Sequence, residues 1–350
     1  MGSPTSASTE PTEAPISGGV AALLHVGTGS GEILRLMWRG GDGVDVLSAT
    51  PCGEMPSFLA YGANHVYAID EFGETLRTFI SGYGKALVEV GRVACEGGPA
   101  YLAVDHHLGL AFVANYGGGT IAVARIQDEI IAFAPQQIVA AAKYPHAAVV
   151  DPSRRFLLVP CKGADQILVY AIDAQSGRIS EEPVHVAEVA AGSGPRHLAF
   201  DQSGANAFVS NELDSTVTAL AFDTATGRLQ LRQVASSLPG GSDISGNTAS
   251  DICLSRDERL VYVSNRGHDS VMALGSGLSS DPPLVARGHV STDGAVPRKF
   301  ALHPERPWLV VANQQSCTLC FFDVLQDGGL RRRGKARLPS PPYWVGFGPG

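Results

Sequence analysis

The sequence has few charged residues and no long apolar run. Charged side chains make up 17% of its 350 residues, and no segment approaches the ~18 apolar residues that a membrane helix needs. The net charge of −8 argues against nucleic acid and acidic membranes as partners. It does not exclude a small anionic ligand, because the potential inside a pocket can oppose the charge of the whole chain.

Cysteine is scarce, and its six positions follow no disulfide or metal-binding framework. The one close pair is the C-x-x-C of Cys317 and Cys320. Because residues three apart in a strand point to opposite faces, we interpret this pair as packing rather than as a metal site. The lack of a disulfide framework favours a reducing compartment, and we expect the protein in the cytoplasm.

The first nineteen residues differ in composition from the remainder of the chain. They are rich in Ser, Thr, Pro and Glu, and they contain no basic region leading into an apolar core. We therefore expect residues 1–19 to be a disordered tail rather than a secretory signal. Residues 20–350 are predicted to form a single domain.

Proline and glycine are abundant, with 22 and 41 residues, and proline recurs in a regular pattern. Prolines followed by a short apolar run, with Ser250 filling one gap, lie 43 to 55 residues apart: Pro56, Pro99, Pro145, Pro195, Ser250, Pro297 and Pro342. About sixteen residues later comes a second apolar run that ends on a recurring position: Asp70, Asn115, Cys161, Asn211, Asn265 and Asn313.

The clearest copy of the repeat spans residues 192–223. It reads as three short apolar runs separated by the turn sequences QSGAN and ELDS. Strands joined by such short loops pair antiparallel, so each repeat is a meander. Seven meanders predict an all-β, seven-bladed β-propeller. The stretch 130–142 fits either a helix or two strand pieces. We expect the first and last strands to share a blade and to close the ring.

Equivalent loops of a propeller converge on one mouth of the central channel, so equivalent positions become neighbours. The residues after the first repeated position are Ser57, Ala100, His146, Arg196, Asp251, Arg298 and Tyr343. Those after the second are Tyr116, Lys162, Glu212, Arg266 and Gln314. Both sets vary between repeats and are rich in charge, which indicates a ligand pocket or, alternatively, a ring of salt bridges. The asparagines recur, which indicates local hydrogen bonds.

The residue types suggest distinct roles. Arginine guanidinium groups recognise carboxylate or phosphate, and Glu212 among cations is held ionised and ready to accept a proton. Histidine can stabilise an oxyanion or move protons. The catalytic candidates are Glu212, Arg196 and His146. The substrate-binding candidates are Arg266, His197, Asn211, Arg298 and Gln314.

Several strings resemble the seven-bladed lactonase family, which contains 6-phosphogluconolactonase and 3-carboxy-cis,cis-muconate lactonizing enzyme. They include ANYGGGTIAV (114–123), GSGPRHLAFD (192–201), VSNELDST (209–216) and VYVSNRGHDSV (261–271). The resemblance implies a site without metal or cofactor at the channel mouth. By position it assigns substrate binding and proton transfer to His146, Arg196, Glu212 and Arg266.

The sequence also departs from the family pattern. Where many members carry a long Gly/His-rich loop, this chain has AFAPQQIVAAAKY (132–144), which we expect to reshape one wall of the site. Asp251 stands where a glutamate is common.

Three functional hypotheses follow from the residues and the resemblance. The first is a metal-independent hydrolase for a sugar-acid-type lactone with an anionic group. The second is a cycloisomerase that forms a lactone within one molecule, and the third is a propeller that only binds a partner.

Overall fold

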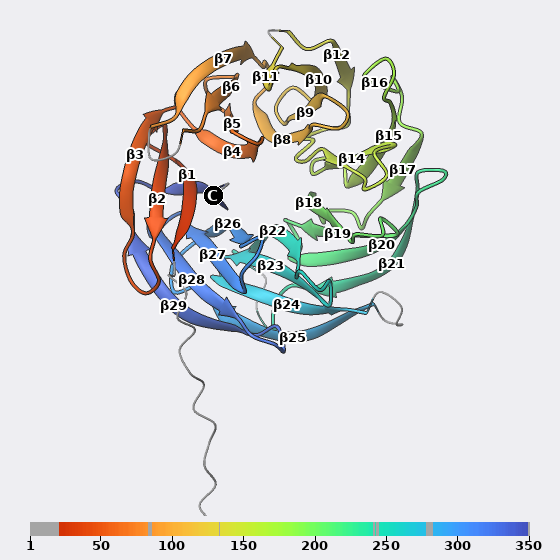
Figure 1. Cartoon of the computed structure of the whole chain (residues 1–350). Coiled ribbons are helices and arrows are strands. Elements are labelled where there is room, and N and C mark those ends of the chain that lie inside the picture. The colour runs from red at the N-terminus through yellow and green to blue at the C-terminus, as the bar shows by residue number, and fades with distance from the viewer. Residues whose placement is uncertain are drawn as a thin grey trace, which may run out of the picture.

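The computed structural model describes residues 21–82, 86–132, 134–240, 242, 245–277 and 283–348. In this part of the chain every element of regular secondary structure is a β-strand, and the strands form seven sheets arranged around a ring (Figure 1). The expected tail at residues 1–19 lies outside the described residues. Among the described residues, no helix is long and apolar enough to span a bilayer. The predicted all-β, seven-bladed propeller is confirmed.

We number the blades from one to seven in chain order. Blade one consists of β4 (Pro56–Tyr61), β5 (His65–Asp70), β6 (Thr75–Ile80) and β7 (Val88–Ala94). Blade two consists of β8 (Pro99–Asp105), β9 (Leu110–Asn115), β10 (Thr120–Gln127), β11 (Ile130–Ile131) and β12 (Gln137–Ala140). Blade three consists of β13 (Val149–Val150), β14 (Phe156–Cys161), β15 (Gln166–Asp173), β16 (Arg178–Ile179) and β17 (His185–Glu188).

The remaining blades each have four strands in the described residues. Blade four consists of β18 (Pro195–Phe200), β19 (Asn206–Asn211), β20 (Thr216–Asp223) and β21 (Arg228–Ser236). Blade five consists of β22 (Thr248–Leu254), β23 (Leu260–Arg266), β24 (Ser270–Ser276) and β25 (Leu284–Ser291). Blade six consists of β26 (Pro297–Leu302), β27 (Trp308–Asn313), β28 (Thr318–Val324) and β29 (Leu330–Arg337). Blade seven consists of β30 (Pro342–Phe347), β1 (Ala22–Thr28), β2 (Glu32–Trp38) and β3 (Asp45–Pro51).

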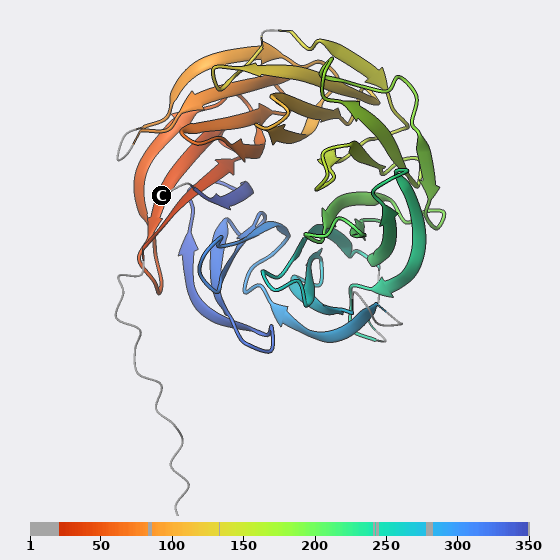
Figure 2. The ribbon, with the colours of Figure 1, turned by 45° about the vertical axis from the view of Figure 1, so that its right-hand side comes forward.

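The ring closes in blade seven, where the two ends of the chain share a sheet. The last strand, β30, pairs antiparallel with β1, for example through Val345 and Val26. The reddest and bluest strands therefore lie side by side in Figures 1 and 2. This confirms the expected closure by the first and last strands.

Each apolar core of the ring lies between two neighbouring blades. Seven clusters of buried side chains occur in the described residues, one for each blade boundary. Between blades six and seven, Trp38 stacks on Phe321 at a centroid distance of 4.2 Å and meets the edge of Trp308 at 5.2 Å. Burial of such large rings is the main favourable contribution to the packing of one blade on the next.

The two repeated positions of the sequence face each other at the start of each blade's innermost strand. Pro195 is paired with Asn211, and Pro297 with Asn313. The pairing shifts at the next residue, so that the residue after the proline forms a β-bulge, which redirects its side chain. These bulges lie at the first residues of the innermost strands, which face one mouth of the central channel.

Blade five corrects the predicted alignment by one residue. Asn265 pairs with Ala249, not with Ser250, so Ser250 occupies the bulge position and Asp251 is the counterpart of His197. The backbone N–H groups confirm this, since His197 donates to the Ser210 hydroxyl and Asp251 donates to the Ser264 hydroxyl. The sequence has no proline at the start of this blade, where the small residues Ala249 and Ser250 both fit the pattern.

Two further sequence interpretations are settled by the strands. The 130–142 stretch forms the two strand pieces β11 and β12, not a helix. Cys317 lies in a turn at a φ of 53°, one residue before β28, so the argument from opposite strand faces does not apply to it. Cys320 is buried in that strand, and all six cysteines are free.

Candidate active site

The bulges bring side chains from different blades to one pocket at the channel mouth. Six of the seven residues that follow the first repeated position line it, joined by Phe58, His197, Lys299 and Trp344. The six are Ser57, Ala100, His146, Arg196, Arg298 and Tyr343. The seventh, Asp251, lies behind His197 because of the one-residue shift in blade five. The sequence argument that equivalent positions become neighbours therefore holds.

Glu212 is not among the residues that line this pocket but lies next to it through its contact with Arg196, and three cationic side chains surround it. Its Oε1 lies 2.5 Å from Lys162 Nζ, and its Oε2 lies 3.0 Å from Arg196 Nε and 3.2 Å from Arg266 Nη2. Burial alone raises the pKa of this carboxyl group, but the three cations outweigh burial and lower the pKa to about 2. Glu212 is thus an anion at every physiological pH, as predicted for a carboxylate among cations.

Arg196 is buried and lies between Glu212 and His197. One of its terminal nitrogens, Nη1, lies 3.2 Å from His197 Nε2. Its side chain is 3% exposed, so its charge is separated from bulk water. Burial, followed by the nearby charge of Arg266, lowers the pKa of Arg196 to about 9. Such a desolvated guanidinium interacts more strongly with a developing negative charge than one in water.

A buried carboxylate lies on the other side of His197. Asp251 Oδ1 lies 2.9 Å from His197 Nδ1, and Asp251 Oδ2 accepts hydrogen bonds from Lys299 Nζ at 2.8 Å and from the Phe300 backbone at 3.2 Å. Burial and the charge of Arg196 lower the pKa of His197 to about 3. Lys299 and His197 overcome the effect of burial on Asp251 and hold its pKa well below the ordinary range.

His146 faces the pocket between two aromatic side chains. Its ring meets those of Tyr116 and His197 edge-on, at 5.4 and 5.3 Å between centroids. Its buried Nδ1 has no hydrogen-bond partner among the described residues. Burial, followed by the charge of Arg196, holds the pKa of His146 well below its usual value, so the imidazole is neutral.

The unusual 132–144 segment ends beside this histidine. Tyr144 stacks on Tyr116 at a centroid distance of 4.7 Å, and Tyr116 in turn meets the edge of His146. The Lys162 backbone N–H donates to the Tyr144 carbonyl oxygen, which fixes the end of the segment next to the Glu212 cluster. The segment therefore contributes one aromatic ring, that of Tyr144, to the surroundings of Tyr116 and His146.

Two charged residues of the mouth were missed by the sequence analysis. Glu71 follows Asp70 in blade one just as Glu212 follows Asn211 in blade four, so the repeat itself was the signal. Its Oε2 is buried without a hydrogen-bond partner in the described residues, and its charge opposes the lowering of the Arg298 pKa by burial. Lys299 occupies the position in blade six that His197 holds in blade four.

Three substrate-binding candidates remain to be placed. Arg298 lines the pocket and lies over the Tyr343 ring at 5.3 Å, with no ion pair among the described residues. Asn211 does not line it, because its amide donates to Thr216 and Thr218 in its own blade. This is the local role predicted from its recurrence and argues against its use as a substrate ligand. Gln314 is half-buried after β27 and is also outside the pocket lining.

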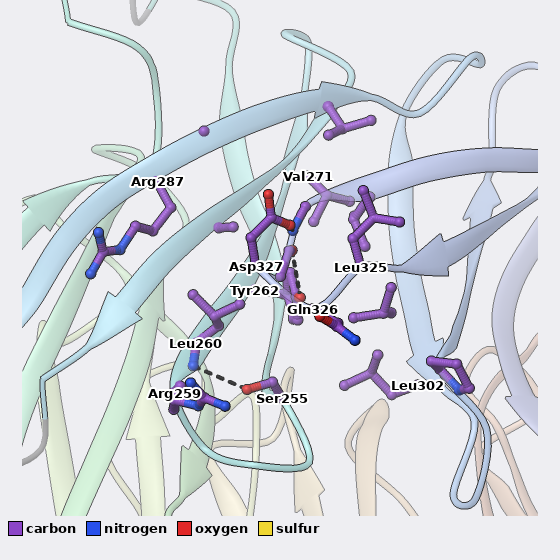
Figure 3. Close-up of a pocket in the computed structure, with 18 of the residues that line it drawn as sticks. Ser255, Arg259, Leu260, Tyr262, Val271, Arg287, Leu302, Leu325, Gln326 and Asp327 are labelled. Carbon is purple, nitrogen blue, oxygen red and sulfur yellow. Dashed lines mark hydrogen bonds between the residues drawn. The ribbon is translucent and has the colours of Figure 1, made fainter. Parts of the chain in front are cut away.

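A larger cavity of about 1030 Å³ lies elsewhere, between blades five and six at the far ends of β22 and β26. Figure 3 shows Ser255, Leu260 and Tyr262 of blade five together with side chains of blade six in this far groove. Its ion pair between Arg259 and Asp257 is exposed, with side chains 78% and 51% accessible. Volume alone favours this groove. The mouth is the stronger candidate because Arg196, His197 and Asp251 are buried close together there and all have strongly shifted pKa values.

Comparisons with known proteins agree with the propeller and with the resemblance noted in the sequence. A family model described as "Lactonase, 7-bladed beta-propeller" matches residues 24–347. The 6-phosphogluconolactonase of Sodalis glossinidius (strain morsitans) is 29% identical over 295 residues, which cover 84% of this chain and 83% of the relative. That of Pectobacterium carotovorum subsp. carotovorum (strain PC1) is 28% identical over 292 residues, covering 83% and 86%.

Solved structures give the same result. A periplasmic gluconolactonase of Pseudomonas aeruginosa superposes with a TM-score of 0.84 at 26% identity, covering 93% of this chain and 99% of its own. A protein from Lactobacillus plantarum superposes with the same TM-score at 25% identity and the same coverage. Because the family model spans all seven blades, the chain belongs to the seven-bladed β-propeller lactonase family.

Proposed function

We propose that the protein hydrolyses a lactone that carries an anionic group and that it does so at the channel mouth. The observation that carries this proposal is the buried guanidinium of Arg196, held beside the ionised Glu212 and close to the neutral His146. Desolvated donors next to an ionised acceptor suit a reaction in which water attacks a carbonyl group and an oxyanion develops. The relatives named 6-phosphogluconolactonase support this reaction class.

In the proposed reaction, Glu212 orients the attacking water. The water oxygen bonds to the lactone carbonyl carbon, and its proton passes to Glu212, while Arg196 and His146 stabilise the oxyanion. When the ring C–O bond breaks, the departing alkoxide takes that proton and Glu212 is ionised again. The low pKa makes Glu212 a weak base, so its main contribution is to position water and cations.

Charge at the mouth favours an anionic substrate. The cationic side chains described above number five, and the carboxylates three, which leaves a local charge of about +2 with neutral histidines. The cations are Lys162, Arg196, Arg266, Arg298 and Lys299, and the carboxylates are Glu71, Glu212 and Asp251. Arg266 is engaged with Glu212, whereas Arg298 has no ion pair among the described residues. We therefore assign the anionic group of the substrate to Arg298, with Arg266 in support.

The chemistry needs no metal ion, because guanidinium and imidazole groups supply the stabilisation of the oxyanion. We also propose a cytoplasmic location, which the six free cysteines support. One structural relative is named as periplasmic. Activity that survives chelators, and fractionation of the native protein, test these two proposals.

The first experiment is ring opening of 6-phosphoglucono-δ-lactone, measured against the spontaneous rate. We expect the wild type to accelerate it and Glu212→Gln to lose at least about 100-fold in kcat/KM, because the variant removes the anion that organises three cations. Asp257→Asn, the same type of change in the far groove, is the matched control and should leave the rate unchanged.

If the wild type shows no acceleration on this or on other anionic lactones, hydrolysis is excluded. Carboxylated muconates then test the cycloisomerase alternative.

A further inference from the structure

A row of polar side chains crosses three blades behind Arg196. Arg196 and His197 come from blade four, Asp251 from blade five and Lys299 from blade six. The successive contacts are 3.2 Å from Arg196 to His197, 2.9 Å from His197 to Asp251 and 2.8 Å from Asp251 to Lys299. Nothing in the proposed lactone hydrolysis uses His197, Asp251 or Lys299 directly.

The partners of His197 determine where its single proton lies. A guanidinium has only donors, so the contact with Arg196 Nη1 requires Nε2 of His197 to be the acceptor. The proton of the neutral ring is then on Nδ1, where it is donated to Asp251 Oδ1. Asp251 is fixed in turn by Lys299 and by the Phe300 backbone N–H. The row therefore specifies one tautomer.

Aromatic rings close the space around this histidine. Tyr101 and Phe58 meet the His197 ring edge-on at 5.5 and 6.3 Å, and His146 does so at 5.3 Å. The His197 side chain is 7% exposed. Both of its nitrogens are engaged with protein groups, so it has no nitrogen available for a substrate oxyanion or for a proton in transit. This differs from the substrate-binding role expected from the sequence.

An Asp–His pair in an active site often activates a nucleophile. The partner of His197 Nε2 excludes that role here. In such a pair, Nε2 takes a proton from a hydroxyl, a thiol or water. Here Nε2 lies against a guanidinium, which does not release its proton. The same geometry is well suited to hold a guanidinium in place.

We propose that His197, with Asp251 and Lys299 behind it, is a positioning residue that orients the Arg196 guanidinium toward the oxyanion. The proposal rests on the proposed hydrolysis at this site. Glu212 fixes Arg196 on one side and His197 on the other, so the N–H groups facing the pocket are directed from both sides. Misplacing a catalytic group by about 1 Å costs on the order of 100-fold in rate, which gives the row a measurable function.

A pair of similar variants separates positioning from mere packing. His197→Gln places an amide oxygen near the position of Nε2 and keeps an acceptor for Arg196. His197→Asn keeps only a polar group near Nδ1. We expect His197→Asn to lose about 10- to 100-fold in kcat with little change in KM, and His197→Gln to recover most of that loss. Equal loss in both variants overturns the proposal.

The tautomer gives a readout that needs no substrate. Nitrogen NMR of the wild type should show His197 as the Nδ1–H form, without titration between pH 5 and 8. The charged and titratable groups that face the ring are Arg196, Asp251, Lys299, His146 and Tyr101. Asp251→Asn, whose amide can donate to Nδ1, should populate the Nε2–H form and lower kcat about 10-fold or more. Asp257→Asn is the control.

A wild-type ring in the Nε2–H form, or one that titrates in this range, overturns the proposal whatever the activity. If the tautomer is as expected but no lactone is hydrolysed, the proposed function fails and the role of His197 in that reaction fails with it.

Discussion

The channel mouth and the far groove between blades five and six contain the same residue types in opposite settings. In the far groove, Arg259 and Asp257 form an ion pair that is largely exposed to solvent. At the mouth, Arg196 and Glu212 form an ion pair whose side chains are 3% and 10% exposed. An exposed pair contributes little to stability, whereas burial of charge is costly unless every group finds partners.

This difference is the reason why we do not locate the candidate site by cavity size. The far groove is the larger cavity, but its Arg259–Asp257 ion pair is largely exposed to solvent. At the mouth, Arg196 and His197 line one small pocket and have strongly shifted pKa values. The carboxyl group of Glu212, whose pKa is also shifted, lies behind Arg196. Burial of several charges that stability alone does not require is a better sign of chemistry than volume.

The substitution Arg196→Lys at the mouth is expected to have the largest effect on activity, and it tests this contrast between the mouth and the far groove. Arg196→Lys keeps the positive charge but loses the planar set of donors that reaches both Glu212 and His197. We expect kcat/KM for a phosphorylated lactone to fall by about 100- to 1000-fold, which is the usual cost of removing an oxyanion donor. Steady-state kinetics measures it.

Arg259→Lys in the far groove is the matched control and should leave kcat/KM within about twofold, because an exposed pair holds no reacting group. A comparable loss in both variants would contradict the assignment of the site to the mouth.

Acid should reduce the contribution of the mouth to the free energy of unfolding more than that of the far groove. The folded pKa of Glu212 is about 2 against an ordinary 4.5, so its contribution is present above pH 4.5 and is lost as pH falls toward 2. The folded pKa of His197 is about 3 against 6.5, so protonation of the unfolded chain reduces stability as pH falls from 6.5 toward 3. Both effects have the same sign, and each amounts to about 3 to 5 kcal/mol at its limit.

Denaturant unfolding between pH 7 and pH 4 measures this loss. His197→Gln should show a flatter dependence than the wild type, since it cannot bind the proton. If wild type and His197→Gln respond alike, the low pKa of His197 is wrong.

The sequence predicted the ring and most of the mouth because both depend on the repeat. His146, Arg196 and Arg298 were found by counting from prolines, since equivalent bulges must face one channel. Blade five was misplaced by one residue because Ala249 stands where the other blades have proline. The row from His197 through Asp251 to Lys299 could not be predicted, because it depends on which side of each strand faces the neighbouring blade.

A smaller effect is expected at Glu71, the carboxylate missed in blade one. Its charge acts on Arg298, so it opposes the binding of an anion there. Glu71→Gln should tighten the binding of 6-phosphogluconate by about fivefold, as expected for removal of one like charge at intermediate dielectric. Titration calorimetry at low and high salt checks the prediction. Weaker binding would show instead that Glu71 contacts the ligand directly.

The smallest effect on activity is expected from the far groove, whose side chains we expect to contribute to stability but not to the reaction. The Tyr262 hydroxyl donates to the Gly328 carbonyl oxygen at 2.7 Å and so links blade five to blade six. Tyr262→Phe leaves that carbonyl without its partner and should lower the free energy of unfolding by about 1 to 3 kcal/mol. Since the ring at the mouth is built from the opposite ends of β22 and β26, kcat/KM should not change. Denaturant unfolding and kinetics on the same sample test both parts, and a loss of activity without a loss of stability would show that the far groove takes part in the reaction.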